Sequence, residues 1–234
     1  MKKSTLLLTM LVCSTLIGGS LSASAHSVAP KAAELSVLVN GVPVQSSDNH
    51  TWNGKTYVSV AQFAKLFNKT AIVGKDNKSV TFNGKTISNV RLHEGTMTAW
   101  IRDLADAVHA QAVTVDATKN EVYVLALPEG TVQITPLVPA MGEHWSNPQA
   151  GDLPTGPIYG VYKGKLVFLE YMVAQEDFVA GKNHVNVPGM KGYPSPSVVQ
   201  FDLEFQEHGH EGFEVPHYDI HAYFISDEEQ QKIK

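Results

Sequence analysis

The sequence predicts an α+β protein: an N-terminal duplicated helix-plus-β-hairpin module followed by a mainly antiparallel β domain. Two observations support this prediction. Apolar residues recur at helical spacing in two short N-terminal segments, and an alternating hairpin pattern follows each of them. Beyond residue 140 the helical stripes disappear, glycine and proline become frequent, and apolar residues alternate as they do in strands.

Residues 1–25 have the organisation of a signal peptide. Lys2 and Lys3 form a positive n-region, an apolar run follows over residues 6–17, and Ala23-Ser24-Ala25 offers the small residues of a cleavage site. The apolar run is shorter than the roughly 20 residues that a membrane span needs. We therefore expect a secreted or cell-envelope-associated protein with no membrane span after cleavage.

Composition narrows the classes of partner. The chain has a formal net charge of −5, and the removal of two lysines with the signal peptide makes it more acidic. Nucleic-acid binding needs a basic surface, so we expect no nucleic-acid partner. The one cysteine, Cys13, lies in the signal peptide, so the exported chain must fold without a disulfide.

Residues 26–34 are predicted to be a leader, and residues 35–127 to be the duplicated module. Asn40-Gly41 follows an alternating run and Asn53-Gly54 precedes one, which is a strong hairpin signal. Ser59 is a predicted helix N-cap with Gln62 three residues later. Two stripes share the same helical spacing, and hairpin patterns follow each: Val60, Phe63, Ala64, Phe67 and Ile101, Leu104, Ala105, Val108.

These residues carry a resemblance to a known family. Val39-Asn40-Gly41-Val42-Pro43-Val44, Asn53-Gly54-Lys55-Thr56-Tyr57-Val58 and the helix–hairpin that follows resemble the copper amine oxidase N-terminal-like (stalk) domain of secreted bacterial proteins. Where that family usually has Pro-Leu-Arg, this chain has Ser59-Val60-Ala61. The resemblance implies an accessory module without the copper site or the quinone, whose role is presentation or partner contact.

Residues 128–140 are a predicted linker, and residues 141–234 a β-rich domain. The segment 157–173 predicts a hairpin with a tight turn at Lys163-Gly164. Its second strand is apolar on both faces, so Glu170 is expected to be a buried carboxylate that must be paired, protonated or bound to a metal. Segment 174–196 is a long loop, and Ser226 with Glu229 predicts a capped C-terminal helix.

The strand around residues 215–225 carries the densest chemistry. Alternate side chains share one face, so His217, Asp219 and His221 project together with Tyr223. His217 and His221 lie too far apart on a straight strand to share one ion, so Asp219 pairs with one of them.

Further ligands must come from distant segments. The predicted metal ligands are His144, Glu170, His217, Asp219 and His221, for a divalent ion among which zinc, copper, iron and manganese are not distinguished. The competing interpretation is a strand with one wet face and no metal. The histidines of His208-Gly209-His210 are assigned to a solvated turn, and a weak adventitious metal site is the alternative.

Three functional hypotheses stay open. The first is an exported, non-catalytic accessory or binding protein whose C-terminal domain binds a divalent metal. The second is a metal-dependent secreted enzyme with Glu143 or Glu170 as general base. The third is a cell-envelope protein without metal, which contacts a cell-wall or extracellular protein partner through Trp145, Tyr159 and Tyr162. No Gly-x-Ser-x-Gly or His-Glu-x-x-His motif is present, and the balance favours a protein that is not an enzyme.

The C-terminal segment also resembles a family of secreted bacterial proteins without assigned function. The matching phrases are Gly156-Pro157-Ile158-Tyr159-Gly160-Val161-Tyr162, Leu169-Glu170-Tyr171-Met172 and Pro216-His217-Tyr218-Asp219-Ile220-His221-Ala222-Tyr223-Phe224. The resemblance implies no activity. It implies that Glu170 and the strand with His217, Asp219 and His221 contribute to the same site.

Overall fold

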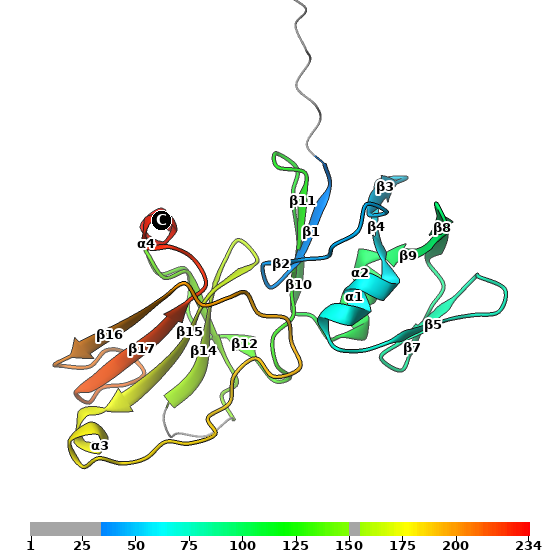
Figure 1. The fold of residues 1–234 in the computed structure, drawn as a ribbon. Helices are drawn as coiled ribbons and strands as arrows, with labels where there is room; N and C mark the ends of the chain where they lie inside the picture. The colour runs from blue at the N-terminus through cyan, green and yellow to red at the C-terminus, as the bar shows by residue number, and fades with distance from the viewer. Residues whose placement is uncertain (1–33, 150–154) are drawn as a thin grey trace, which may run out of the picture. The chain divides into compact units, whose positions relative to one another are not determined.

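β-Sheets dominate the structure, a computed structural model that describes residues 34–149 and 155–234 (Figure 1). Strands account for 43% of these residues and helices for 12%, so the protein is mostly β and the predicted α+β class is wrong. The predicted signal peptide and all of the predicted leader except Glu34 lie outside the described residues.

Three sheets form in the N-terminal half. The first has the order β10-β11-β1-β2: Ala112–Asp116, Glu121–Leu125, Ser36–Val39 and Val42–Pro43. The second has the order β3-β4-β9-β8: His50–Trp52, Lys55–Ser59, Thr96–Trp100 and Val90–His93. The third has the order β5-β6-β7: Ala71–Val73, Val80–Phe82 and Lys85–Ile87. The pairings are antiparallel except that β1 runs parallel to β11.

Two short helices form where the apolar stripes predict them. They are α1 (Val60–Leu66) and α2 (Ile101–Ala107), each with seven residues. Ser59 caps α1 and accepts a hydrogen bond from the backbone N–H of Gln62. Both helices bury their striped faces, because a helix this short is stable only when tertiary packing supports it.

The predicted duplicated module is nevertheless wrong. The hairpin after α1 (β5–β6) pairs with β7, whereas the hairpin after α2 (β10–β11) pairs with β1, far away in the sequence. The two halves therefore do not repeat one structural unit. Periodicity within a segment fixes a helical face, but it does not determine which distant strand completes a sheet.

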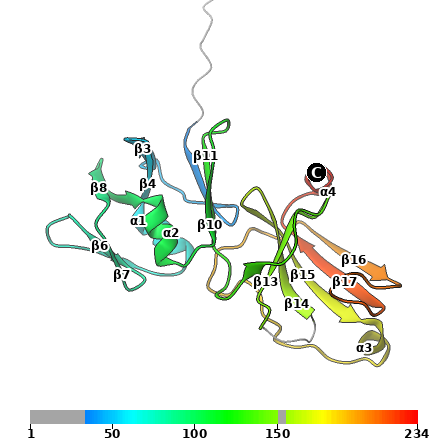
Figure 2. The same ribbon diagram turned by 180° about the vertical axis from the view of Figure 1, so that it is seen from behind.

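One six-stranded antiparallel sheet forms the C-terminal half (Figures 1 and 2). Its order is β12-β13-β14-β15-β17-β16: Val132–Gln133, Glu143–Ser146, Thr155–Tyr162, Lys165–Ala174, His217–Tyr223 and Gln200–Gln206. Helices α3 (Gln175–Val179) and α4 (Asp227–Gln230) follow β15 and β17. The predicted hairpin with its Lys163-Gly164 turn is confirmed, as is the Ser226–Glu229 capping box of α4.

Cross-strand register decides which side chains share a face of this sheet. Glu170 lies opposite His221 between β15 and β17, and Asp202 lies opposite His221 on the other side, in β16. Residues at paired positions project to the same face. One face therefore gathers the histidines and carboxylates of three adjacent strands.

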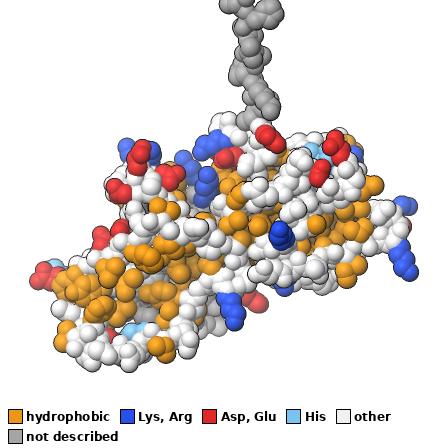
Figure 3. All heavy atoms as spheres, viewed as in Figure 1, with side chains coloured by type: hydrophobic (Ala, Val, Ile, Leu, Met, Phe, Trp, Pro, Cys, Tyr) orange, Lys and Arg blue, Asp and Glu red, His pale blue; other side chains and the backbone are white. Residues whose placement is uncertain are grey.

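The opposite face of β16 is apolar and exposed. Phe201, Leu203 and Phe205 alternate along this edge strand with exposed fractions of 65%, 61% and 43%. In the space-filling view, apolar side chains gather over the region of β16 and β17 (Figure 3). The two faces of the sheet thus differ sharply in chemistry.

Hydrophobic packing connects the strands of the two halves. Leu125 and Leu127 belong to the same buried cluster as Tyr159, Val161 and Leu166. The described residues form one compact unit. The division into segments 35–127, 128–140 and 141–234 stays a prediction.

Within the described part of the chain, no helix is both long enough and apolar enough to span a membrane.

Candidate metal centre

Strand β17 turns its histidines inward. His217 and His221 are fully buried and Asp219 is 3% exposed, while the residues between them are only partly buried. This alternation confirms the predicted shared face. It also contradicts the alternative of a wet face, because polar side chains on a wet face would be exposed.

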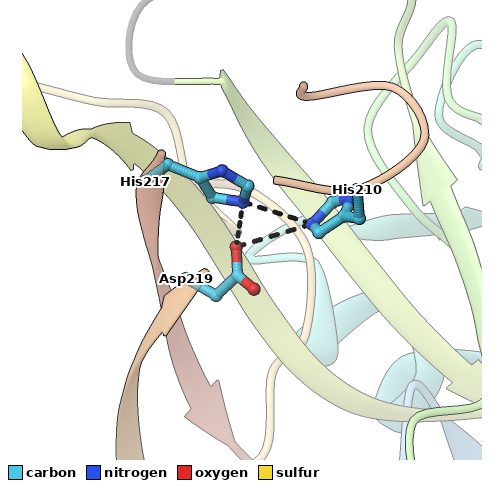
Figure 4. Close-up of side chains that lie close together, drawn as sticks. All are labelled: His210, His217 and Asp219. Atoms are coloured by element: carbon cyan, nitrogen blue, oxygen red, sulfur yellow. Dashed lines mark hydrogen bonds and ion pairs between the residues drawn. The ribbon is translucent and has the colours of Figure 1, made fainter. Parts of the chain in front are cut away.

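Three side chains of this region converge on one point (Figure 4). The Nε2 atoms of His210 and His217 lie 3.2 Å apart. Asp219 Oδ1 lies 3.1 Å from Nε2 of His217 and 3.8 Å from Nε2 of His210. Among the described residues, this group meets the geometric requirement for a shared metal ion.

The dimensions of the triangle fit a transition metal. A circle through three atoms at these separations has a radius of about 2.0 Å, which matches the lengths of zinc–nitrogen and zinc–carboxylate bonds. One ion can therefore contact all three atoms without moving them. Two imidazoles and one carboxylate are also a donor set typical of zinc and of non-haem iron.

Hydrogen bonds on the outer side fix the tautomer of both imidazoles. His217 Nδ1 lies 2.6 Å from the carbonyl oxygen of Val215, and His210 Nδ1 lies 3.1 Å from that of Glu211. A carbonyl only accepts, so each Nδ1 carries the proton and each Nε2 presents a lone pair to the triangle. Carbonyl-held imidazoles of this kind are the usual outer support of metal ligands.

Asp219 is held in the same manner. Its Oδ2 accepts a hydrogen bond of 3.0 Å from Nε2 of Gln206, whereas the buried Oδ1 has no hydrogen-bond partner. Three acceptor atoms thus face one another with no donor among them. Such an arrangement repels itself unless a cation, either a proton or a metal ion, lies at the centre.

His210 was not among the predicted ligands, because its motif was assigned to a solvated turn. The turn after β16 folds back, and a bridge between His210 and Phe213 carries the imidazole over β17. Gly209 has φ of +65°, and a Cβ there would lie 2.6 Å from the carbonyl oxygen of Phe213, so the turn requires glycine. His208 of the same motif is 89% exposed, as predicted. Only the folded turn distinguishes the two histidines.

Glu170 and His221 meet in a neighbouring position. Glu170 is 3% exposed, which confirms the predicted buried carboxylate, and its Oε1 lies 3.4 Å from Nε2 of His221. Burial, with the negative charges of Asp219 and Glu204, raises the pKa of Glu170 to about 8. Burial also lowers the pKa of His221, although Asp219 and Asp202 oppose that effect.

His144 lies on β13 and makes different contacts. Its Nδ1 is 3.0 Å from Oγ1 of Thr135, and its ring packs edge-on against Phe168, which also packs against His221. Burial, with the nearby His221 and His210, lowers the pKa of His144 to about 4. Of the five predicted ligands, the structure therefore joins His217 and Asp219 to His210, pairs Glu170 with His221, and leaves His144 outside both groups.

One large cleft lies elsewhere and has different chemistry. It has a volume of about 900 Å³ and lies between α1, β5 and β9. Its lining includes Lys65 and Lys69 but no histidine or carboxylate. The concentration of titratable groups in the C-terminal sheet is the stronger functional candidate.

The aromatic residues expected to contact a partner are placed differently. Tyr159 is 1% exposed and belongs to the core, so the expectation that it is exposed is wrong. Trp145 and Tyr162 are partly buried. The exposed aromatic side chains of this half are Phe178, Phe201 and Phe205.

No known protein family matches the chain, and no curated protein matches it. One similar solved structure is the hypothetical protein TTHB210 from Thermus thermophilus, with 21% identity over 42% of this chain and 84% of that one, at a TM-score of 0.35. This likeness supports no argument, and the resemblance of residues 35–127 to the stalk domain stays a prediction.

Proposed function

We propose that this is an exported, non-catalytic protein that binds a divalent transition-metal ion of the zinc type through His210, His217 and Asp219. The supporting observation is the convergence of three acceptor atoms whose separations match those of ligands around one ion. The outer hydrogen bonds of both imidazoles and of Asp219 add to this support. Export is proposed from the signal-peptide pattern of residues 1–25.

The donor set favours some ions over others. Magnesium and calcium prefer all-oxygen sites, whereas imidazole nitrogens suit zinc, copper and iron. Three protein ligands leave at least one coordination position for water or for a ligand atom from a partner. The N-terminal half would then present this centre to other molecules outside the cell.

Metal binding is tested on protein purified without a nickel column and stripped with a chelator. Titration with zinc, copper(II), manganese(II) and anaerobic iron(II) should show tight binding of zinc, with a rise in melting temperature. X-ray absorption should find two imidazole nitrogens at about 2.0–2.1 Å from zinc. The His208→Asn variant serves as control, because His208 is exposed on the same turn.

A negative result has a clear form. If none of the four ions raises the melting temperature, or if His217→Asn and Asp219→Asn bind zinc as tightly as the parent protein, the centre is not a metal site. A proton would then take the place of the metal ion among the three atoms.

A further inference from the structure

We infer that Glu170 and His221 form a second, weaker site for a divalent cation beside the first, with Glu204 orienting the imidazole of His221. This second site rests on the proposed function, and variants at each site distinguish the two. It is carried by buried polar atoms that lack partners and by the uncompensated negative charge on this face of the sheet.

Several buried polar atoms at this position are unsatisfied. His221 is fully buried, and neither of its ring nitrogens has a hydrogen-bond partner. Oε2 of Glu170 is buried and lacks a partner as well. Unsatisfied buried groups of this kind are costly and uncommon, so the open Nε2 of His221 and the open Oε2 of Glu170 indicate a missing cation or proton between these two side chains.

The distances around His221 suit metal coordination. The separation of 3.4 Å between Nε2 of His221 and Oε1 of Glu170 fits two neighbouring ligands of one ion. On the far side of the ring, Nδ1 lies 3.7 Å from Oε2 of Glu204. This contact is longer than a hydrogen bond, but a carboxylate on this side of the ring is the usual outer support of a metal-bound histidine, and Glu204 is the side chain placed to take that role.

Negative charge accumulates on this face of the sheet. Four carboxylates lie around His221. Glu170 and Asp202 are paired with it in the two neighbouring strands. Asp219 lies two residues before it on β17, and Glu204 is paired with Asp219 in β16. Across residues 34–149 and 155–234, no lysine or arginine forms an ion pair with any of them. One divalent ion at the first centre leaves negative charge that a second cation would compensate.

The alternative is a proton instead of a metal. A protonated Glu170 can donate to Nε2 of His221, and burial favours that neutral form. This arrangement satisfies Nε2 of His221 and leaves the buried Oε2 of Glu170 unpaired. Metal stoichiometry distinguishes the two cases.

The experiment counts zinc ions bound by the stripped protein in calorimetric titrations against competing chelators. The parent protein should bind two ions with unequal affinity. Glu170→Gln, which is nearly isosteric, should remove the weaker event and keep the tighter one. His217→Asn should remove the tighter event and keep the weaker one.

An exposed side chain provides a second test if the buried variant Glu170→Gln does not fold. The side chain of Glu204 is 58% exposed, so Glu204→Gln should leave the fold intact and weaken the second event by about 10–100-fold. Glu207→Gln, at a side chain that is 78% exposed in the following turn, should leave both events unchanged.

The outcomes are distinct. A single bound ion that persists in Glu170→Gln and is lost in His217→Asn would overturn the second site and keep the proposed function. A single ion that persists in His217→Asn and is lost in Glu170→Gln would keep the Glu170–His221 site and overturn the first. One ion lost in both variants would mean one shared centre, and would overturn the inference.

Discussion

Replacing His210 separates metal binding from folding. Its side chain is 43% exposed, so His210→Asn should change the stability of the metal-free protein by no more than about 0.5 kcal/mol. His217 and Asp219 are buried, so replacing either should cost more stability than replacing the exposed His210. The exposed position makes His210 the cleanest ligand to remove.

The expected loss follows from ligand count. Losing an outer hydrogen bond to a metal ligand costs about 10–100-fold in affinity, so losing one of three ligands should cost at least about 100-fold. At a zinc concentration about 100 times the dissociation constant, binding stabilises the parent protein by about 2.7 kcal/mol, and a hundredfold weaker variant keeps about 0.4 kcal/mol. For a chain of this size, the rise in melting temperature on zinc addition should fall from about 5–10 °C to about 1–2 °C.

The assay is thermal unfolding with and without zinc, for His210→Asn and for the matched variant His208→Asn. His208 lies two residues away on the same turn, and its side chain is 89% exposed. The reasoning is refuted if His210→Asn keeps the full zinc-dependent shift, or if His208→Asn loses as much of it.

Three further predictions concern groups around and outside the centre. Gln206→Leu removes the donor to Oδ2 of Asp219 and should weaken zinc binding by about 10–100-fold in calorimetry; an unchanged affinity would contradict the role of that hydrogen bond. Burial lowers the pKa of His144 from 6.5 to about 4. Between these pH values the imidazole is protonated in the unfolded chain but neutral in the folded one, so the free energy of unfolding falls as the pH falls, by up to about 1.4 kcal/mol per pH unit. Urea unfolding at pH 7 and pH 5 should show a smaller loss for His144→Gln, and equal losses would argue against that pKa. Asn40→Ala removes three buried hydrogen bonds, with both main-chain polar groups of Ala126 and with the carbonyl of Pro194, and should cost about 2–4 kcal/mol in denaturant unfolding; a loss below about 1 kcal/mol would show that those groups find other partners.

Local patterns in the sequence predicted several local elements correctly, although helix α3 lies in segment 174–196, which was predicted to be a loop. Asn40-Gly41 forms a two-residue turn between β1 and β2 with positive φ at both positions, and Ser226 begins α4 with a complete capping box. The alternation of His217, Asp219 and His221 in β17 places them on one buried face. Each of these features depends on neighbours within a few residues, which is why composition and spacing suffice for them.

Long-range pairing was beyond the reach of those patterns. β1 lies beside β11, and β17 lies between β15 and β16, so sheet partners come from strands far apart in the sequence. The predicted α+β class failed for this reason, because two short helices with clear stripes suggested a repeated unit that the sheets do not share.

The metal centre likewise has one part that the sequence predicted and another part that only the folded structure decided. Residue spacing alone was enough to place His217 and Asp219 on a shared face, because a strand has a fixed period of two residues. The addition of His210 to the triangle depends on the folded chain, since a glycine-dependent turn brings it back over β17. Folding also placed Phe168 against both His144 and His221. Side chains that meet through a turn or across a sheet are positioned by tertiary packing, which residue spacing along the chain does not predict.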